Sequence, residues 1–510
     1  MADYNAIIIG SGAGGLSAAL KLARSDYSVM LLEAMPSFGR YLNPLHRKGY
    51  TFDTGLHYLG ELGRGDRFWR LFEDLGIIES IAFVELDPDG FDRYLFPDYE
   101  LTVCKGKERF IELLISDFPK EERGIHKFFE VSEKILKAGK ASRSMGKGAL
   151  NKRSFIIKNS PMMKYLRVPF QSLLNEVTTD IRLQAALAAP CGDYGVPPAE
   201  ASVIIAVNVW EHYLKGAYYP CGGSGALRDA FVHALKGYGA ELKKSSCVVS
   251  IDKPDKEFII TTESGEKHTA RVVISDADPV ITLGELVNPE LVSSDIKRKV
   301  TGMRPSGGSF YAFIGTDLDL PSLGIKDANI IHYSDYDINR LYKMWPVSTA
   351  PEDFPMFFIT SPSVKDPEGG HAPDGHHTLE IVTGASYKLF EQWADLPSMK
   401  RGDEYKALKE RIGERIIAAA ERYIPSLSQH IVFVEYATPL SNKYWVNAVR
   451  GGNYGPDQTP DQVGIGRFIT STAGIAGLFL AGAGTIGGVV MPSVSSGIQA
   501  SQKAAAYLKN

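Results

Sequence analysis

The clearest pattern in the chain is a short apolar run that changes, within a few residues, into a helical repeat. Ala6 to Ile9 is apolar and mostly β-branched, which is typical of a buried strand and too short for a buried helix. Small residues fill Gly10 to Gly15, and leucines and alanines then follow at helical spacing. A second apolar run, Ser28 to Leu32, ends in Glu33. The pattern predicts a strand, a glycine-rich turn, a helix and a second strand.

The turn has the spacing G-x-G-x-x-G, at Gly10, Gly12 and Gly15. In such a unit the first glycine permits a tight turn, the second lets the backbone approach a pyrophosphate, and the third lets helix and strand pack closely. Free N–H groups at the helix N-terminus attract the phosphates. A carboxylate at Glu33 can accept hydrogen bonds from the ribose hydroxyls of an adenosine. We therefore predict a dinucleotide site, the alternative being a structural glycine turn beside a surface glutamate.

A second signature of the same kind lies near the other end of the chain. Leu478 to Ala481 is apolar, a glycine-rich turn begins at Gly482, and a helix is predicted from about Pro492. Two such turns suit an extended dinucleotide held at both ends, which favours FAD over NAD. The start of the second helix, near Met491 and Pro492, is expected to face the pyrimidine edge of a flavin, because the helix dipole stabilises negative charge there.

Between these signatures, helical and extended patterns alternate. Residues 66–219 are predicted to be rich in helix, and residues 291–440 to mix strands with a long helix over Tyr405 to Tyr423. We expect one domain to be assembled from residues 1–65, 220–290 and 441–510, and a second from the two intervening stretches, 66–219 and 291–440.

The composition of the chain excludes some classes of protein but does not indicate a function. Of the 510 residues, 44% are hydrophobic and 23% are charged, which is ordinary for a globular protein, and the net charge of -4 gives no general attraction to nucleic acid. Four cysteines without C-x-x-C spacing argue against a zinc site and suit a reducing compartment. No secretory signal and no apolar run of about 18 residues is found, so we expect a cytoplasmic protein.

Residues 134–167 form a basic segment. Between Glu133 and Glu176 there is no carboxylate, while lysines and arginines alternate with apolar residues. Each basic side chain near an anionic lipid surface contributes about 1 kcal/mol, and apolar side chains can enter the interface. The pattern fits either a peripheral contact with the inner membrane surface or a solvated helix face with a flexible loop.

Five stretches resemble the phytoene desaturase-like flavoproteins, which include carotenoid desaturases, carotenoid isomerases and retinol saturase. They are FDTGLHYLG (52–60), YYPCGGSGALRDAF (218–231), VVISDADP (272–279), KDPEGGHAPDGHHTLEI (365–381) and AGAGTIGGVVMPSV (481–494). The resemblance runs almost end to end. It implies an α/β fold, with a Rossmann-like FAD-binding domain of the GR2, amine-oxidase type and an interleaved α+β substrate domain.

The resemblance also implies which residues hold FAD. The matching positions on the adenosine and phosphate side are Gly10, Gly12, Gly15, Glu33, Arg40 and Gly482, with Ala13, Ala34 and Gly39 beside them, and Val248 offers its backbone to the adenine. The positions expected around the ribityl chain and flavin are Thr485, Met491, Pro492 and Val494. The chain departs from the desaturase pattern at Phe38, Ile486, Gly487 and Val490, so the direction of the reaction is left open.

The implied chemistry is hydride transfer at carbon–carbon bonds of a lipophilic polyene of the carotenoid or retinoid type, as a saturase or a desaturase. Because flavin N5 exchanges the hydride, few catalytic side chains are needed. His57 and Tyr58 are the candidate proton donors, and the imidazole has the better matched pKa. His57 could instead be a core residue bonded to backbone. The electron donor or acceptor is not identified by the sequence.

Three alternatives stay open. Cis–trans isomerisation of a polyene by the same cofactor is the alternative enzyme function. A non-enzymatic prenyl-lipid binding protein of the Rab GDP-dissociation inhibitor type shares the scaffold, although the intact glycine turns argue against it. An amine oxidase shares the fold as well. No metal site is predicted, since His376 and His377 are adjacent in a predicted strand and point to opposite faces.

Overall fold

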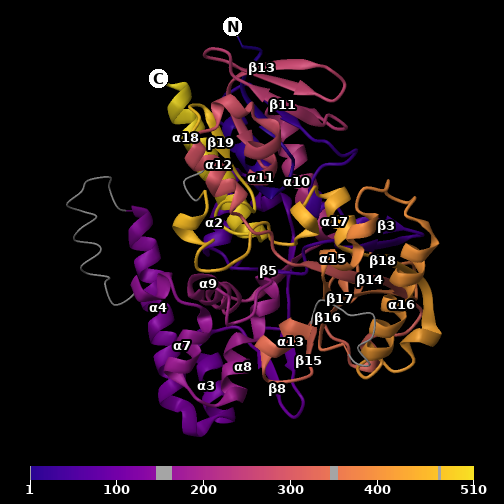
Figure 1. Cartoon of the computed structure of the whole chain (residues 1–510). Helices are drawn as coiled ribbons and strands as arrows, with labels where there is room; N and C mark the ends of the chain where they lie inside the picture. The colour runs from indigo at the N-terminus through magenta and orange to yellow at the C-terminus, as the bar shows by residue number, and fades with distance from the viewer. Residues whose placement is uncertain (1, 145–162, 345–353, 469–472) are drawn as a thin grey trace.

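The computed structural model describes residues 2–144, 163–344, 354–468 and 473–510. Two large sheets and a layer of helices surround the middle of the molecule. Both chain termini lie beside the first sheet, at the top of Figure 1, while α3, α4, α7 and α8 lie at the lower left and the second sheet with α16 lies at the right.

The first sheet contains both glycine turns. Its strands follow the order β10-β2-β1-β13-β12-β11, and β19 pairs with β13. Parallel pairing joins β1 to β2, β1 to β13, and β13 to β19, so the turns after β1 and β19 leave the same edge of the sheet. The bounds are β1 Tyr4–Ile9, β2 Val29–Leu32, β10 Glu241–Lys243, β11 Val248–Asp252, β12 Phe258–Thr262, β13 Lys267–Ser275 and β19 Leu478–Leu480.

Two helices that start at the glycine turns pack against each other over this sheet. They are α1 (Ala13–Ala23) and α18 (Val490–Leu508), and α1 also packs against α10 (Gly223–Gly237). The crossing is very close, because a Cβ at Gly497 would lie less than 3.0 Å from the backbone oxygen of Gly14. Ser17 Oγ donates to the Val494 carbonyl at 3.2 Å across the same crossing. The predicted strands and helices at both ends of the chain are confirmed.

The second sheet follows the order β18-β14-β17-β16-β15-β7-β8. The helix α16 (Gly402–Ala420) packs on it and begins and ends a few residues earlier than predicted. The strand bounds are β7 Asp92–Leu95, β8 Glu100–Val103, β14 Gly308–Thr316, β15 Asn329–Tyr333, β16 Met356–Thr360, β17 His377–Ala385 and β18 Ile431–Ala437. The hairpin β7–β8 falls within the stretch predicted to be helical, and it extends this sheet because β7 pairs in parallel with the distant β15.

Helices dominate the remainder of residues 66–219. They are α2 (Arg67–Leu75), α3 (Lys107–Asp117), α4 (Glu122–Ser144), α7 (Phe170–Val177), α8 (Ile181–Ala188) and α9 (Val203–Tyr213), beside a small sheet of β5 (Leu59–Gly60), β9 (Ala217–Pro220) and β6 (Phe83–Glu85). Shorter elements are β3 (Leu45–Arg47), β4 (Tyr50–Phe52), α11 (Pro279–Ile281), α12 (Ser294–Thr301), α13 (Ile338–Met344), α14 (Pro362–Lys365), α15 (Tyr387–Phe390) and α17 (Pro439–Trp445).

The two sheets draw on different parts of the chain. Strands of the first come from residues 4–32, 241–275 and 478–480, and strands of the second from residues 92–103 and 308–437. The domain boundaries drawn from the sequence are compatible with this division, and they stay a prediction.

The basic segment lies partly outside the described residues, because residues 145–162 are not among them. In the described part, Lys137 pairs with Glu133 at 2.5 Å, Lys134 pairs with Glu130, and Lys164 pairs with Glu176 at 2.9 Å. Among the described helices, none is long and apolar enough to cross a bilayer. Membrane contact through residues 134–167 and a cytoplasmic location stay predictions.

A methyl group at Gly14 should separate the two glycine turns. A Cβ there would lie 2.5 Å from the Gly482 backbone nitrogen, so the packed ends of α1 and α18 would have to move. We expect Gly14→Ala to lower the free energy of unfolding by about 1–3 kcal/mol, measured by thermal denaturation. The control is Gly139→Ala in α4, where a Cβ meets nothing within 4 Å and stability should be unchanged or rise by up to about 1 kcal/mol. Equal melting temperatures for the two variants would contradict the packing described.

Candidate functional site

One cavity of about 1300 Å³ begins at the two glycine turns and extends to the second sheet and the helical layer. Pockets for a single small molecule measure about 300–1,000 Å³, so this cavity has room for more than one. At one end it is lined by Gly12, Arg40 and Gly482, and at the other by side chains such as Tyr213 and Tyr333.

Glu33 lies at the end of β2 and is fully buried beneath the first turn. Its carboxylate accepts hydrogen bonds from the Ser11 backbone at 3.0 Å, the Ser11 hydroxyl at 2.6 Å and the Met35 backbone at 2.8 Å. Arg40 pairs with it at 2.9 Å and also lines the cavity. The predicted ribose acceptor is thus held in place by its own chain, and Arg40 covers it on the cavity side.

A carboxyl group that was not among the predicted site residues lines the cavity between the two turns. Asp276 follows β13, and a Cβ at Gly12, Gly14 or Gly482 would lie less than 3.0 Å from its oxygens. Burial raises the pKa of the Asp276 carboxyl to about 7, although hydrogen bonds from the Gly15 and Gly12 backbone act in the opposite direction. The carboxyl therefore occupies the helix N-terminus where a pyrophosphate would bind.

At the second turn, Gly482 adopts a φ of +78°, which favours glycine. Its N–H donates to Ser496 Oγ at 2.8 Å, and its carbonyl accepts from Thr485 Oγ1 at 2.7 Å. Thr485 and Val494 are fully buried, whereas Met491 and Pro492, at the start of α18, line the cavity.

The predicted cofactor residues therefore divide into two groups. The cavity is lined by Gly10, Gly12, Ala13, Ala34, Gly39, Arg40, Val248, Gly482, Met491 and Pro492. The residues that support the wall from behind are Gly15, Glu33, Thr485 and Val494. The structure brings both groups together around one cavity, from segments at opposite ends of the chain.

The sequence profile of proteins described as flavin containing amine oxidoreductases matches residues 13–505. The chain belongs to this family. FAD is its cofactor, and it is an oxidoreductase with the predicted α/β fold. All-trans-retinol 13,14-reductase of Rattus norvegicus is 28% identical over 480 residues, which cover 89% of this chain and 77% of that protein.

Two further comparisons agree with this assignment. Chloroplastic prolycopene isomerase of Arabidopsis thaliana is 26% identical over 522 residues, which cover 99% of this chain and 83% of the isomerase. A solved oxidoreductase from Methanosarcina mazei has a TM-score of 0.65 at 16% identity, covering 98% of this chain and 99% of that one. The resemblance to carotenoid and retinoid flavoproteins noted in the sequence is confirmed.

The residues present fit FAD. Gly12 lines the cavity at the α1 N-terminus with Asp276 against it, Arg40 lies over the buried Glu33, and α18 points its N-terminus into the cavity beside Met491. When bound, FAD supplies hydride transfer. Gly12 and Gly482, which line the cavity, are the residues that would hold its pyrophosphate, and this role stays a prediction.

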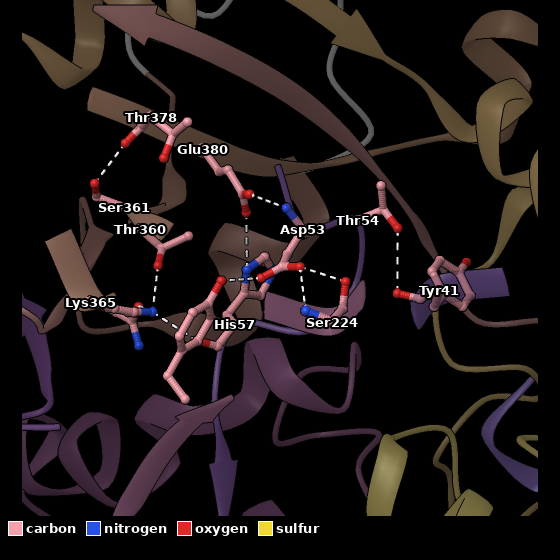
Figure 2. A network of polar contacts seen from close by, with 12 residues as sticks. Tyr41, Asp53, Thr54, His57, Ser224, Thr360, Ser361, Lys365, Thr378 and Glu380 are labelled. Carbon is pink, nitrogen blue, oxygen red and sulfur yellow. Dashed lines mark hydrogen bonds and ion pairs between the residues drawn. The ribbon is translucent and has the colours of Figure 1, made fainter. Parts of the chain in front are cut away.

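A network of buried polar groups lies beside His57 (Figure 2). Ser224 donates its backbone N–H to Asp53 at 2.8 Å, and Asp53 donates its own to Glu380 at 2.7 Å. His57 Nδ1 lies 3.2 Å from Glu380 Oε2. Burial raises the pKa of the Glu380 carboxyl well above its usual range and, with the Lys365 charge, lowers the pKa of His57 to about 3.

This network bears on the two predicted proton donors. Because its pKa is low, the His57 imidazole is neutral near neutral pH and does not offer a proton as the imidazolium. It lines the cavity with its ring against Phe358. Tyr58 also lines the cavity, and its hydroxyl donates to Asp92 Oδ2 at 2.5 Å. Their catalytic roles stay predictions.

Lys365 is the buried cation of this network. Its ammonium donates to the His57 carbonyl at 2.8 Å, to Asn329 Oδ1 at 2.6 Å and to Thr360 Oγ1 at 2.6 Å, which uses all three N–H groups (Figure 2). Burial lowers the pKa of the Lys365 ammonium to about 8, although nearby carboxylates, Asp92 first among them, favour the charged form. In the sequence, Lys365 is distinguished only by its place in a family motif.

Replacing Asp276 by asparagine should change how FAD binding depends on pH. An ionised Asp276 repels a pyrophosphate, so wild-type affinity should fall as pH rises above about 7, by up to about tenfold per pH unit. Asp276→Asn should have a flatter profile and tighter binding at pH 8, measured by fluorescence titration of the apoprotein with FAD. The exposed Asp255→Asn is the control. Parallel profiles for wild type and Asp276→Asn would show that Asp276 does not face the pyrophosphate.

Removing the buried cation should unfold the network around it. Lys365→Met leaves three acceptors unsatisfied and the nearby carboxylates uncompensated, so we expect a loss of about 3–5 kcal/mol in the free energy of unfolding. Urea denaturation followed by tryptophan fluorescence measures the change. Lys256→Met, at an exposed position, should leave the denaturation midpoint where it is in the wild type. A Lys365→Met midpoint equal to that of the control is the result that would contradict this role.

Proposed function

We propose that this protein reduces a carbon–carbon double bond of a lipophilic polyene, of the retinoid or carotenoid kind, with FAD as the hydride carrier. The observation that carries the proposal is the continuity of the cavity. The same space that begins at the glycine turns is lined further on by Ile204, Ile205 and Val209 of α9 and by Ile331 and Phe357 of the second sheet. An apolar arm that opens onto the flavin end suits a long apolar substrate.

The relatives favour saturation among the reactions that this geometry permits. All-trans-retinol 13,14-reductases of rat and zebrafish are each 28% identical to the chain over most of its length. A reductase of this kind adds a hydride to one alkene carbon and a proton to the other. The protein must then exclude water from the arm, hold the polyene against the flavin and provide the proton.

Cis–trans isomerisation is the second candidate. It is supported by the prolycopene isomerases, whose alignments cover 99% of this chain. The same arm would hold the polyene, and no atoms would be gained or lost overall. The mass of the product separates the two candidates.

A polyene panel tests the proposal. The purified FAD protein is photoreduced without oxygen and incubated with all-trans-retinol or with a linear carotene. The molecular masses of the products are then measured by mass spectrometry. We expect a gain of two hydrogen atoms. An unchanged mass with a new retention time would instead assign isomerisation, and a loss of hydrogen with oxidised protein would assign desaturation.

A variant that fills the arm provides the control for this experiment. Val209→Trp should keep the flavin spectrum and reduce turnover at least about tenfold, because the indole occupies space that the substrate needs. Val432→Trp, at a position 52% exposed on β18, should behave as the wild type. Full turnover by Val209→Trp would place the substrate elsewhere.

A further inference from the structure

Four polar side chains form a row along the wall of the cavity beyond the flavin end. They are Asp92 on β7, Tyr58, Tyr213 at the end of α9, and Asp193 after α8, and all four line the cavity. The Tyr58 hydroxyl donates to Asp92 at 2.5 Å, and the rings of Tyr58 and Tyr213 lie 4.7 Å apart. Tyr213 interacts through its hydroxyl with Tyr58 and with the Asp193 carboxyl.

This row ends close to the turn that receives the flavin. The Tyr454 hydroxyl donates to the Gly192 carbonyl at 2.8 Å, and a Cβ at Gly195 would lie 2.7 Å from the Tyr454 ring. On its other side, the Tyr454 backbone lies less than 3.0 Å from a Cβ built at Gly488, within the second glycine turn. Tyr454 therefore places the short loop that carries Asp193 directly against the flavin turn.

The surroundings of Asp193 keep its carboxyl group uncharged. Tyr213 forms a hydrogen bond with it. The other titratable groups within electrostatic range are the phenols of Tyr58, Tyr94, Tyr194, Tyr333 and Tyr454 and the Cys191 thiol. Burial, and next the like charge of Asp92, raise the pKa of Asp193 to about 8. Burial raises the pKa of Asp92 to about 6, where hydrogen bonds from Tyr58 and Asn329 limit the rise.

Asp193 and Asp92 line one cavity, and their surroundings give the two carboxyl groups different pKa values. In such a pair, one group commonly acts as the acid and the other is its ionised partner. We propose that Asp193 is the proton donor of the double-bond reduction and that Asp92, acting through Tyr58 and Tyr213, is a positioning residue that keeps Asp193 in its acid form. This inference rests on the proposed function and names the residue that completes it.

The step balances as a reduction. FAD, when bound and reduced, would supply a hydride with both electrons for one alkene carbon and would be left oxidised. The O–H bond of Asp193 breaks, its proton forms the new C–H bond at the other alkene carbon, and the Asp193 carboxylate remains. A proton from solvent restores the acid before the next turnover.

The first test needs no substrate. In difference infrared spectra of the oxidised FAD protein, the wild type should show the carbonyl band of a protonated carboxylic acid. As the pH rises and the acid ionises, this band should disappear with a midpoint near pH 8. The component that disappears near pH 8 should be missing from Asp193→Asn, whereas the carbonyl bands of protonated Glu380 and Asp276 should remain. In Asp92→Asn the midpoint should move to lower pH, since a like charge has been removed. A band unaffected by Asp193→Asn would overturn the assignment.

The second test follows reoxidation of the photoreduced flavin by the polyene in a single turnover. Asp193→Asn should slow it about 100-fold or more with an unchanged flavin spectrum, and Asp193→Ser is a second variant with a smaller side chain. The wild-type rate should fall above about pH 8, and Asp92→Asn should shift that fall to lower pH, which a purely structural role would not do. The exposed Asp395→Asn is the control.

The outcomes separate this inference from the proposed function. Wild-type turnover that Asp193→Asn leaves intact would overturn the proton donor alone. Absence of turnover with every polyene in the wild type would overturn both, whatever the infrared band shows.

Discussion

The structure depends on the close approach of two glycine turns that lie at opposite ends of the chain. Gly14 lies so close to Gly482 that a Cβ on Gly14 would clash with the Gly482 backbone. Gly497 lacks a side chain, which lets the backbones of α18 and α1 come into contact. The parallel strands β1, β13 and β19 hold both turns at one edge of the first sheet. Because two helix N-termini then point into one cavity, an extended dinucleotide can be bound along its length. The apolar arm that we propose for the substrate is an extension of that same space.

Desolvation sets the chemistry of the cavity wall. Limited contact with water raises the pKa values of the Glu380, Asp193 and Asp276 carboxyl groups and lowers the pKa of His57 to about 3. Lys365 is held by three hydrogen bonds among these groups. A site that carries little net charge near neutral pH can accept an apolar polyene without a large cost in desolvation. Raised carboxyl pKa values also make acids available, so one physical cause serves both substrate binding and proton supply.

The family and the related proteins define the reaction to different degrees. The family profile fixes the flavin, the oxidoreductase chemistry and the fold. The retinol reductases and prolycopene isomerases share that framework while their names assign different outcomes to the polyene. In this chain the cavity wall beyond the glycine turns carries Tyr58, Tyr213 and Asp193. Net reduction consumes one proton in each turnover, whereas isomerisation leaves the number of hydrogen atoms unchanged.

The sequence alone determined the two glycine turns, Glu33, the strands and helices next to them, and the cofactor, because each is specified by a few neighbouring residues with a fixed spacing. It also indicated that Arg40 and Met491 belong to the site. The hairpin β7–β8 was missed, since its partner β15 lies more than 200 residues away. For the same reason Asp193 carried no local signal, and Asp276 and Lys365 were marked only by their places in family motifs. Their pKa values arise from burial and from neighbours that only the folded chain brings together.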